Sequence, residues 1–260
     1  MRNLMIGAVL LVTAVAIPLR AEEWNHNYSV NGKPEIVVDT NDGDVEITPG
    51  SSEQVSVRVT VRGIEMKEMN INGNQMGNRV EIKVHRPNHV CIGFCFEEIH
   101  IFVQVPRDSD LKLRSGDGNL RVQDVRGRME LDTNDGDMRL HGVEGVLHAD
   151  THDGNVDVSG KFDSLDLRTG DGNIDAEISA SASPQPGWML RTGDGNMHLR
   201  LPGNFAADIS AHTGDGSVRV DFPMTTSGSQ SEHSIHGKLN GGGLALDLQT
   251  GDGDIQVEKM

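Results

Sequence analysis

Apolar and polar residues alternate along most of the chain, in short runs separated by Asp-Gly steps. A representative stretch has apolar residues at Met129 and Leu131, a step that ends at Gly136, and apolar residues again at Met138 and Leu140. A period of two is typical of strands with one buried face. Each unit is therefore predicted to be two short strands joined by a turn, and the chain as a whole is predicted to be all-β.

The Asp-Gly step recurs at a spacing of 18 residues in the centre of the chain. Its eight copies end at Gly43, Gly118, Gly136, Gly154, Gly172, Gly195, Gly216 and Gly253. When the copies are aligned, apolar residues stand seven and five positions before the glycine and two and four positions after it, and Thr or Ser stands three before it. Such repetition is typical of stacked repeats, so all four apolar columns are predicted to point inward.

Both residues of the step suit a tight turn. An Asp side chain caps its own backbone, and Gly adopts a positive φ without steric cost. We therefore expect each Asp to cap its turn and Gly172, in the middle of the array, to have a positive φ.

Two architectures share this period. In a repetitive β-solenoid with two strands per turn, equivalent strands of successive 18-residue units stack on one another. In an antiparallel β-meander, Thr133 would instead pair with Met138 across the Asp-Gly hairpin. The recurrence of similar residues in one column favours the solenoid, and the meander stays open as the alternative.

Two excursions interrupt the regular pattern. Residues 48–107 contain longer alternating strands, with Asn72-Gly73 as a predicted turn between the first two. Residues 108–260 form the regular T-x-D-G array, in which residues 223–243 are rich in Ser, Thr and Gly and predict a mobile surface loop. Because both ends follow the same column pattern, residues 22–260 are predicted to form a single repetitive β domain.

Residues 1–21 have the pattern of a signal peptide. Arg2 precedes an uncharged apolar stretch, and Ala21 offers a small residue for cleavage before Glu22. The apolar stretch is shorter than the roughly 20 residues that a transmembrane helix needs, and an uncleaved anchor is the alternative because Arg20 lies beside the cleavage site. The mature chain is therefore expected to be exported, to the periplasm, the cell surface or the medium, with no transmembrane span.

Charge and composition exclude several classes of partner. The chain has 23 Lys and Arg against 39 Asp and Glu, a formal net charge of −16. A chain this acidic lacks the basic surface that nucleic acids or anionic membranes require. Aromatic residues make up 3% of the sequence, which disfavours extended stacking platforms for sugars or bases.

The turn aspartates are the strongest candidate for a metal site. In a stack they would form a carboxylate ladder, and hard cations such as calcium take oxygen ligands. The central members of this candidate ladder are Asp117, Asp135, Asp153, Asp171 and Asp194. The units lack the double glycine of calcium-binding β-roll repeats, so turn capping is the simpler interpretation and no cofactor is predicted.

No catalytic constellation stands out in the sequence. The outward positions carry charges of both signs, as at Arg114, Asp132 and Arg168. This pattern suggests ion pairs between side chains of neighbouring strands in contact with solvent. Four histidines lie in repeat units and are interpreted as surface residues: His148, His152, His198 and His212. Scattered carboxylates on a solenoid leave a carbohydrate-active enzyme as an alternative, and the chain is predicted not to be an enzyme.

The cysteines, Cys91 and Cys95, lie close together in one short segment. In an oxidising compartment this arrangement predicts a disulfide that closes a small loop. A redox pair, or half of a metal site with His89 and His100, is the alternative.

Several segments together resemble the toast-rack family of putative adhesins, exported bacterial envelope proteins without an assigned function. They are the early V-V-D-T-N-D-G-D-V-E-I block, the Val-Gln-Val-Pro strand at 103–106, the T-x-D-G units, the glycines at 241–243 and the final L-x-T-G-D-G-D-I. The resemblance implies a repetitive β fold, an extracytoplasmic position and a role in adhesion, envelope organisation or stress sensing. It implies no catalytic residues.

The expected function is therefore that of a non-catalytic envelope protein, an adhesin or interaction scaffold. Its partner would be an envelope protein or a glycan. A groove lined by converging carboxylates and a Lys or Arg would favour the enzyme, whereas flat faces of mixed charge would favour the scaffold.

Overall fold

The computed structural model describes residues 22–87, 97–179, 187–227 and 230–260. These residues form 21 strands in one large, mostly parallel mixed sheet, together with one short 3-10 turn at Met66–Glu68. No α-helix occurs in these ranges. The prediction of an all-β protein is confirmed.

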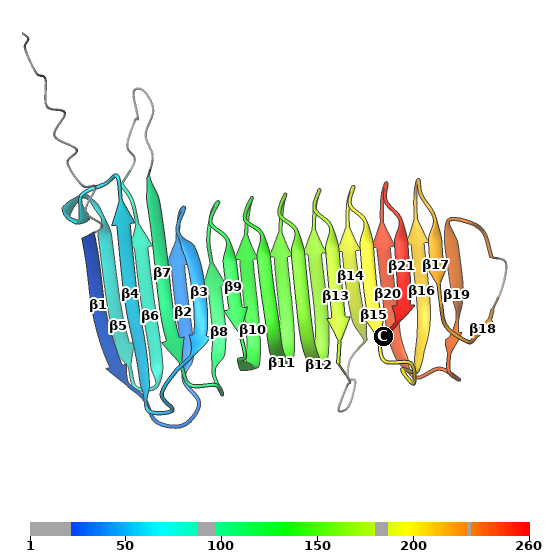
Figure 1. The fold of residues 1–260 in the computed structure, drawn as a ribbon, viewed down its shortest axis with the longest axis horizontal. Coiled ribbons are helices and arrows are strands. Elements are labelled where there is room, and N and C mark those ends of the chain that lie inside the picture. The colour runs from blue at the N-terminus through cyan, green and yellow to red at the C-terminus, as the bar shows by residue number, and fades with distance from the viewer. Residues whose placement is uncertain (1–21, 88–96, 180–186, 228–229) are drawn as a thin grey trace, which may run out of the picture.

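The strands are arranged in two ladders that run the length of the molecule (Figure 1). One ladder holds the strands that precede the Asp-Gly turns, with two further strands at each end. Its neighbours are, in order, β5 (Asn70–Met76), β6 (Arg79–His85), β2 (Glu35–Thr40), β8 (Asp110–Arg114), β10 (Arg126–Thr133), the ends of β11 (Met138–Thr151) and β12 (Val156–Thr169), β14 (Trp188–Thr192), β20 (Leu244–Thr250), β16 (Ala207–Thr213), β19 (Ser234–Leu239) and β18 (Met224–Thr226). The further strands are β5 and β6 at one end and β19 and β18 at the other.

The other ladder holds the strands that follow the turns, with further strands added at its amino-terminal end. Its neighbours are, in order, β1 (Glu22–Ser29), β4 (Gln54–Arg62), β7 (Glu98–Val105), β3 (Asp44–Pro49), β9 (Leu120–Gln123), the starts of β11 and β12, β13 (Ile174–Ile178), β15 (Met197–Leu201), β21 (Ile255–Lys259) and β17 (Val218–Val220). The added strands are β1, β4 and β7.

Pairing within the array is parallel and joins equivalent positions of neighbouring units. Thr133 of β10 pairs with Thr151 of β11, which pairs with Thr169 of β12. The pairing of Thr133 with Met138 that a meander requires is not found. Units therefore stack as layers, and each layer contributes one strand to each ladder.

The four apolar columns all point into the space between the two ladders, as predicted. Leu131, Leu167 and Leu190 are fully buried, and almost every other member of the four columns is buried with them. At roughly 25 cal/mol per Å² of apolar area removed from water, this continuous core is the main favourable contribution to folding.

The order of layers in space departs from the order in the chain at two places. The layer of β2 and β3 lies between the layers of β6/β7 and β8/β9, and the layer of β20 and β21 lies between those of β14/β15 and β16/β17. Figure 1 shows the first pair in blue beside β7 and the second in red between yellow and orange strands. The expectation that successive units always stack on one another is wrong at these insertions.

The amino-terminal end closes with strands that run antiparallel to their neighbours. β1 pairs with β4, β4 with β7, and β5 with β6. The turn between β5 and β6 contains Gly77, with a φ of 60°, so the turn predicted at Asn72-Gly73 is wrong. Gly73 lies inside β5, where it pairs with Ile82 of β6, and a side chain there would meet Tyr28 and Trp24.

The other excursion also differs from its prediction. Residues 223–243, expected to be a mobile loop, contain strands β18 and β19. β19 pairs antiparallel with β16 and covers the edge of the last layer. A Ser-, Thr- and Gly-rich composition does not exclude a strand whose backbone pairs with an existing edge.

Candidate functional site

The Asp-Gly turns form one long edge of the molecule, and buried hydroxyl groups join them. The Thr169 hydroxyl accepts a hydrogen bond from the Gly172 N–H of its own turn at 3.1 Å and donates to the Gly154 carbonyl of the preceding layer at 2.8 Å. Thr192 and Ser115 make the same two bonds in their layers. The hydroxyl column thus caps five of the turns, those of Gly43, Gly118, Gly154, Gly172 and Gly195. It also connects neighbouring turns, because its hydroxyls donate to glycine carbonyls of the adjacent layer.

The turn glycines are required by close stacking rather than by their backbone angles. Gly172 does not have a positive φ, and of the eight turn glycines Gly216 alone does. A Cβ built on Gly172 would lie 2.6 Å from the Gly154 carbonyl carbon and closer still to the carbonyl oxygen. The positive φ predicted for Gly172 is wrong, because parallel stacking brings the backbone of the neighbouring layer to where a side chain would stand.

The five candidate calcium ligands, Asp117, Asp135, Asp153, Asp171 and Asp194, lie in consecutive layers with exposed side chains. Within the described ranges, none of their side chains forms a hydrogen bond with its own turn. In four of the five turns the hydroxyl column is the cap instead, so the capping role expected for Asp is wrong. Burial, together with the like charges of Asp135 and Asp42, raises the pKa of Asp117. Among the residues that the structure describes, no group of three or more His, Cys, Asp or Glu is placed to hold a metal ion.

A second polar column, directly after each turn glycine, was missed in the sequence. The Asn155 side-chain amide donates to the Asp137 carboxylate at 3.1 Å, and the Asn173 amide donates to Asn155 Oδ1 at 3.1 Å. The column continues through the stack as Asp44, Asn119, Asp137, Asn155, Asn173, Asn196, Asp254 and Ser217. A comparison of the residue that follows the turn glycine in each unit would have found this column, because every member is Asn, Asp or Ser.

Outward charged residues of the array largely neutralise one another. His148 lies 3.1 Å from Asp166, and His198 lies 3.0 Å from Glu258. Arg168 also pairs with Asp166, at 3.0 Å. These contacts agree with the interpretation of the repeat-unit histidines as surface residues, and they leave long faces of mixed charge.

A concavity of about 370 Å³ that is rich in carboxylates lies over β6, β2, β8 and β10. Asp110 pairs with Lys33 at 2.5 Å, and Glu130 pairs with Lys112 at 2.6 Å. The hydrogen bond from Lys112 lowers the pKa of Glu130. Burial raises the pKa of Asp110, but Lys33 and a backbone N–H outweigh it, so that this pKa is lowered as well. A glycosidase needs a carboxyl group with a raised pKa as its acid, and neither group is suited to that role.

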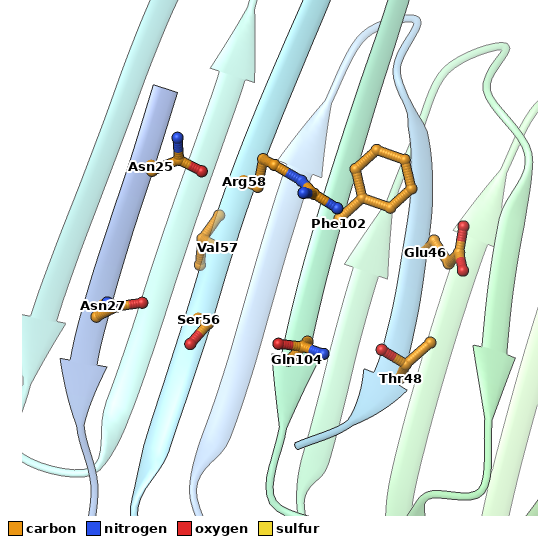
Figure 2. A pocket seen from close by; sticks show the side chains of 9 residues that line it. All are labelled: Asn25, Asn27, Glu46, Thr48, Ser56, Val57, Arg58, Phe102 and Gln104. Carbon is orange, nitrogen blue, oxygen red and sulfur yellow. The ribbon is translucent and has the colours of Figure 1, made fainter. Parts of the chain in front are cut away.

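A second concavity, about 530 Å³ in volume, lies on the outer face at the amino-terminal end (Figure 2). We call it the amino-terminal groove. Its side chains come from four neighbouring strands, β1, β4, β7 and β3, over the buried Val57. The strand register arranges them in two rows, with one residue from each strand. The first row is Asn25, Arg58, Phe102 and Glu46, and the second is Asn27, Ser56, Gln104 and Thr48.

Two predictions concern segments outside the described residues. The disulfide between Cys91 and Cys95 and the signal peptide at residues 1–21 both fall there, so both stay predictions. In the described ranges, no helix has the length and apolarity to span a membrane.

Solved structures that align with this chain include proteins described as adhesins. One is a putative cell adhesion protein from Clostridium sporogenes, with 12% identity and a TM-score of 0.41 over 93% of this chain and 100% of that chain. Another is a putative adhesin from Bacteroides fragilis, with 10% identity and a TM-score of 0.45 over 92% and 97%. No curated protein matches the sequence significantly.

A family model accounts for nearly all of the described chain. It matches twice, over residues 34–177 and over residues 109–258, and each match spans more than half of the sequence. The overlap of the two matches lies in the regular central layers, where one unit resembles the next. The chain belongs to the Toastrack DUF4097 family.

Proposed function

We propose that this chain is a non-catalytic exported envelope protein that acts as an adhesin or interaction scaffold on a two-strand β-solenoid. The observation that carries the proposal is a contrast on its surface. Along the array, outward polar side chains bond to one another from layer to layer. The second row of the amino-terminal groove, Asn27, Ser56, Gln104 and Thr48, instead forms no side-chain hydrogen bond with the protein groups that the structure describes. The descriptions of the similar structures as adhesins agree with this proposal.

The enzyme alternative has weaker support. Hydrolysis of a glycoside uses two carboxyl groups, one of which has a raised pKa. The amino-terminal groove has a single carboxylate, Glu46. In the carboxylate-rich concavity, Asp110 and Glu130 are held ionised by their cationic partners.

Retention on envelope fractions tests the proposal. The exported chain would be purified, biotinylated and incubated with membranes, cell-wall material and surface polysaccharide from a bacterial envelope. We expect saturable retention on at least one fraction, with no shortening of the polysaccharide. Retention no greater than that of a biotinylated control protein of equal charge would contradict the proposal, and release of new sugar ends would favour the enzyme.

A further inference from the structure

We infer that the amino-terminal groove binds an uncharged glycan that lies across strands β1, β4, β7 and β3. The inference rests on the proposed function and names the ligand class of this surface. Neighbouring strands are about 4.8 Å apart, so four strands present a row about 14 Å long. A chain lying along the row would therefore meet one side chain from each strand in turn, as Figure 2 shows.

Phe102 is the first reason for this assignment. Every other Phe, Tyr or Trp among the described residues is buried, except Trp24, which packs against the core. Phe102 instead stands half-buried on the outer face of β7, where the Arg58 guanidinium lies 5.0 Å from the ring centroid. A phenyl ring held in place by a cation is a preorganised apolar surface for the C–H face of a sugar ring.

The free hydrogen-bonding groups of the groove are the second reason. Within the part of the chain that the structure describes, the side chains of Asn27, Ser56, Gln104 and Thr48 form no hydrogen bond with protein groups, and Arg58 forms no ion pair. Amides and hydroxyls both donate and accept, as sugar hydroxyls do. This second row thus offers alternating donors and acceptors next to the ring of Phe102.

Charge decides between kinds of glycan. The groove has one cation and one carboxylate, Arg58 and Glu46, so its own charges balance. The chain around it has a formal net charge of −16, which repels a polyanion. An uncharged polysaccharide avoids that repulsion, and with a single carboxylate the groove is suited to binding rather than to cleavage.

Binding to an array of oligosaccharides tests the inference. The array carries neutral glycans and uronate-containing glycans, and the affinity for each positive glycan is then measured in solution. We expect binding to a neutral glycan, a loss of at least tenfold in Phe102→Ala and a loss of several-fold in Gln104→Ala. The matched control is Gln256→Ala, which removes an exposed glutamine from β21 of the same ladder and should leave the affinity unchanged.

Each outcome decides one question. Circular dichroism and a thermal melt show whether Phe102→Ala is folded, and Gln104→Ala, with its exposed side chain, tests the groove independently. Three outcomes would overturn the inference: binding to uronate glycans alone, no binding to any glycan, or an affinity equal to that of the wild-type chain in all three variants. If the wild-type chain is still retained on envelope fractions in those cases, the proposed function stands and only the glycan site is wrong. If the wild-type chain binds no glycan and is not retained on any envelope fraction, both the glycan site and the proposed function are rejected.

Discussion

Substitution of Gly172 by alanine tests the close stacking of layers directly. The added methyl group would lie 2.6 Å from the Gly154 carbonyl carbon and 2.7 Å from Thr169 Oγ1. Non-bonded heavy atoms normally stay about 3.5 Å apart or more, so the neighbouring layer has to move by about 1 Å. That movement takes the 2.8 Å bond between Thr169 and the Gly154 carbonyl beyond hydrogen-bonding length.

The expected loss of stability combines two effects. Overpacking costs about 1–3 kcal/mol, and a broken buried hydrogen bond adds about 1 kcal/mol or more. We therefore expect Gly172→Ala to lower the free energy of unfolding by about 3 kcal/mol. Urea unfolding followed by circular dichroism measures it through linear extrapolation.

Two further variants make the test specific. Gly203 has no atom within 4 Å of its Cβ position and no positive φ, so Gly203→Ala should change stability by no more than about 0.5 kcal/mol. Gly172→Asn should be at least as damaging as Gly172→Ala, because Asn is larger. If a positive φ were the requirement, Asn would be the better tolerated residue. Equal unfolding midpoints for Gly172→Ala and Gly203→Ala would refute the stacking argument.

Three other predictions follow from the turn edge. Thr192→Val removes a hydroxyl that serves two buried backbone groups and should cost about 2–3 kcal/mol in urea unfolding, whereas Thr192→Ser should be nearly neutral because Ser115 makes the same bonds. The backbone N–H and hydroxyl of Ser217 lower the pKa of Asp254, so the contribution of Asp254 to stability is present above about pH 4 and is lost as the pH falls through the folded-state pKa. Ser217→Ala should therefore raise the pKa of Asp254 in an NMR titration, and an unchanged pKa would argue against the hydrogen bond from the Ser217 hydroxyl. Chelation should leave the melting temperature unchanged at fixed ionic strength, because the turn carboxylates are exposed and their repulsion is screened; a large decrease reversed by calcium and not by magnesium would restore the metal ladder.

The candidate site was only partly predictable from the sequence. The eight turns and the hydroxyl column could be aligned because each repeats at a fixed offset from its glycine. The column from Asp44 to Ser217 could have been found in the same way. The amino-terminal groove could not, because its residues come from four strands between Asn25 and Gln104 that follow no common spacing. Only the antiparallel register of β1, β4 and β7 places Arg58 opposite Phe102.

The sequence by itself determined the strands, the inward columns and the 18-residue stacking. These features depend on the alternation of apolar and polar residues within one unit and on the recurrence of similar residues at equivalent positions of the next unit. Both can be read from the sequence. The order of the layers was decided by the tertiary structure. Leu246 of β20 pairs with Trp188 on one side and with Ile209 on the other, and any two units offer each other the same apolar columns. Because the units are nearly interchangeable as neighbours, the insertion of β20 and β21 depends on the connections and edge strands at the end of the stack, which the repeat pattern does not encode.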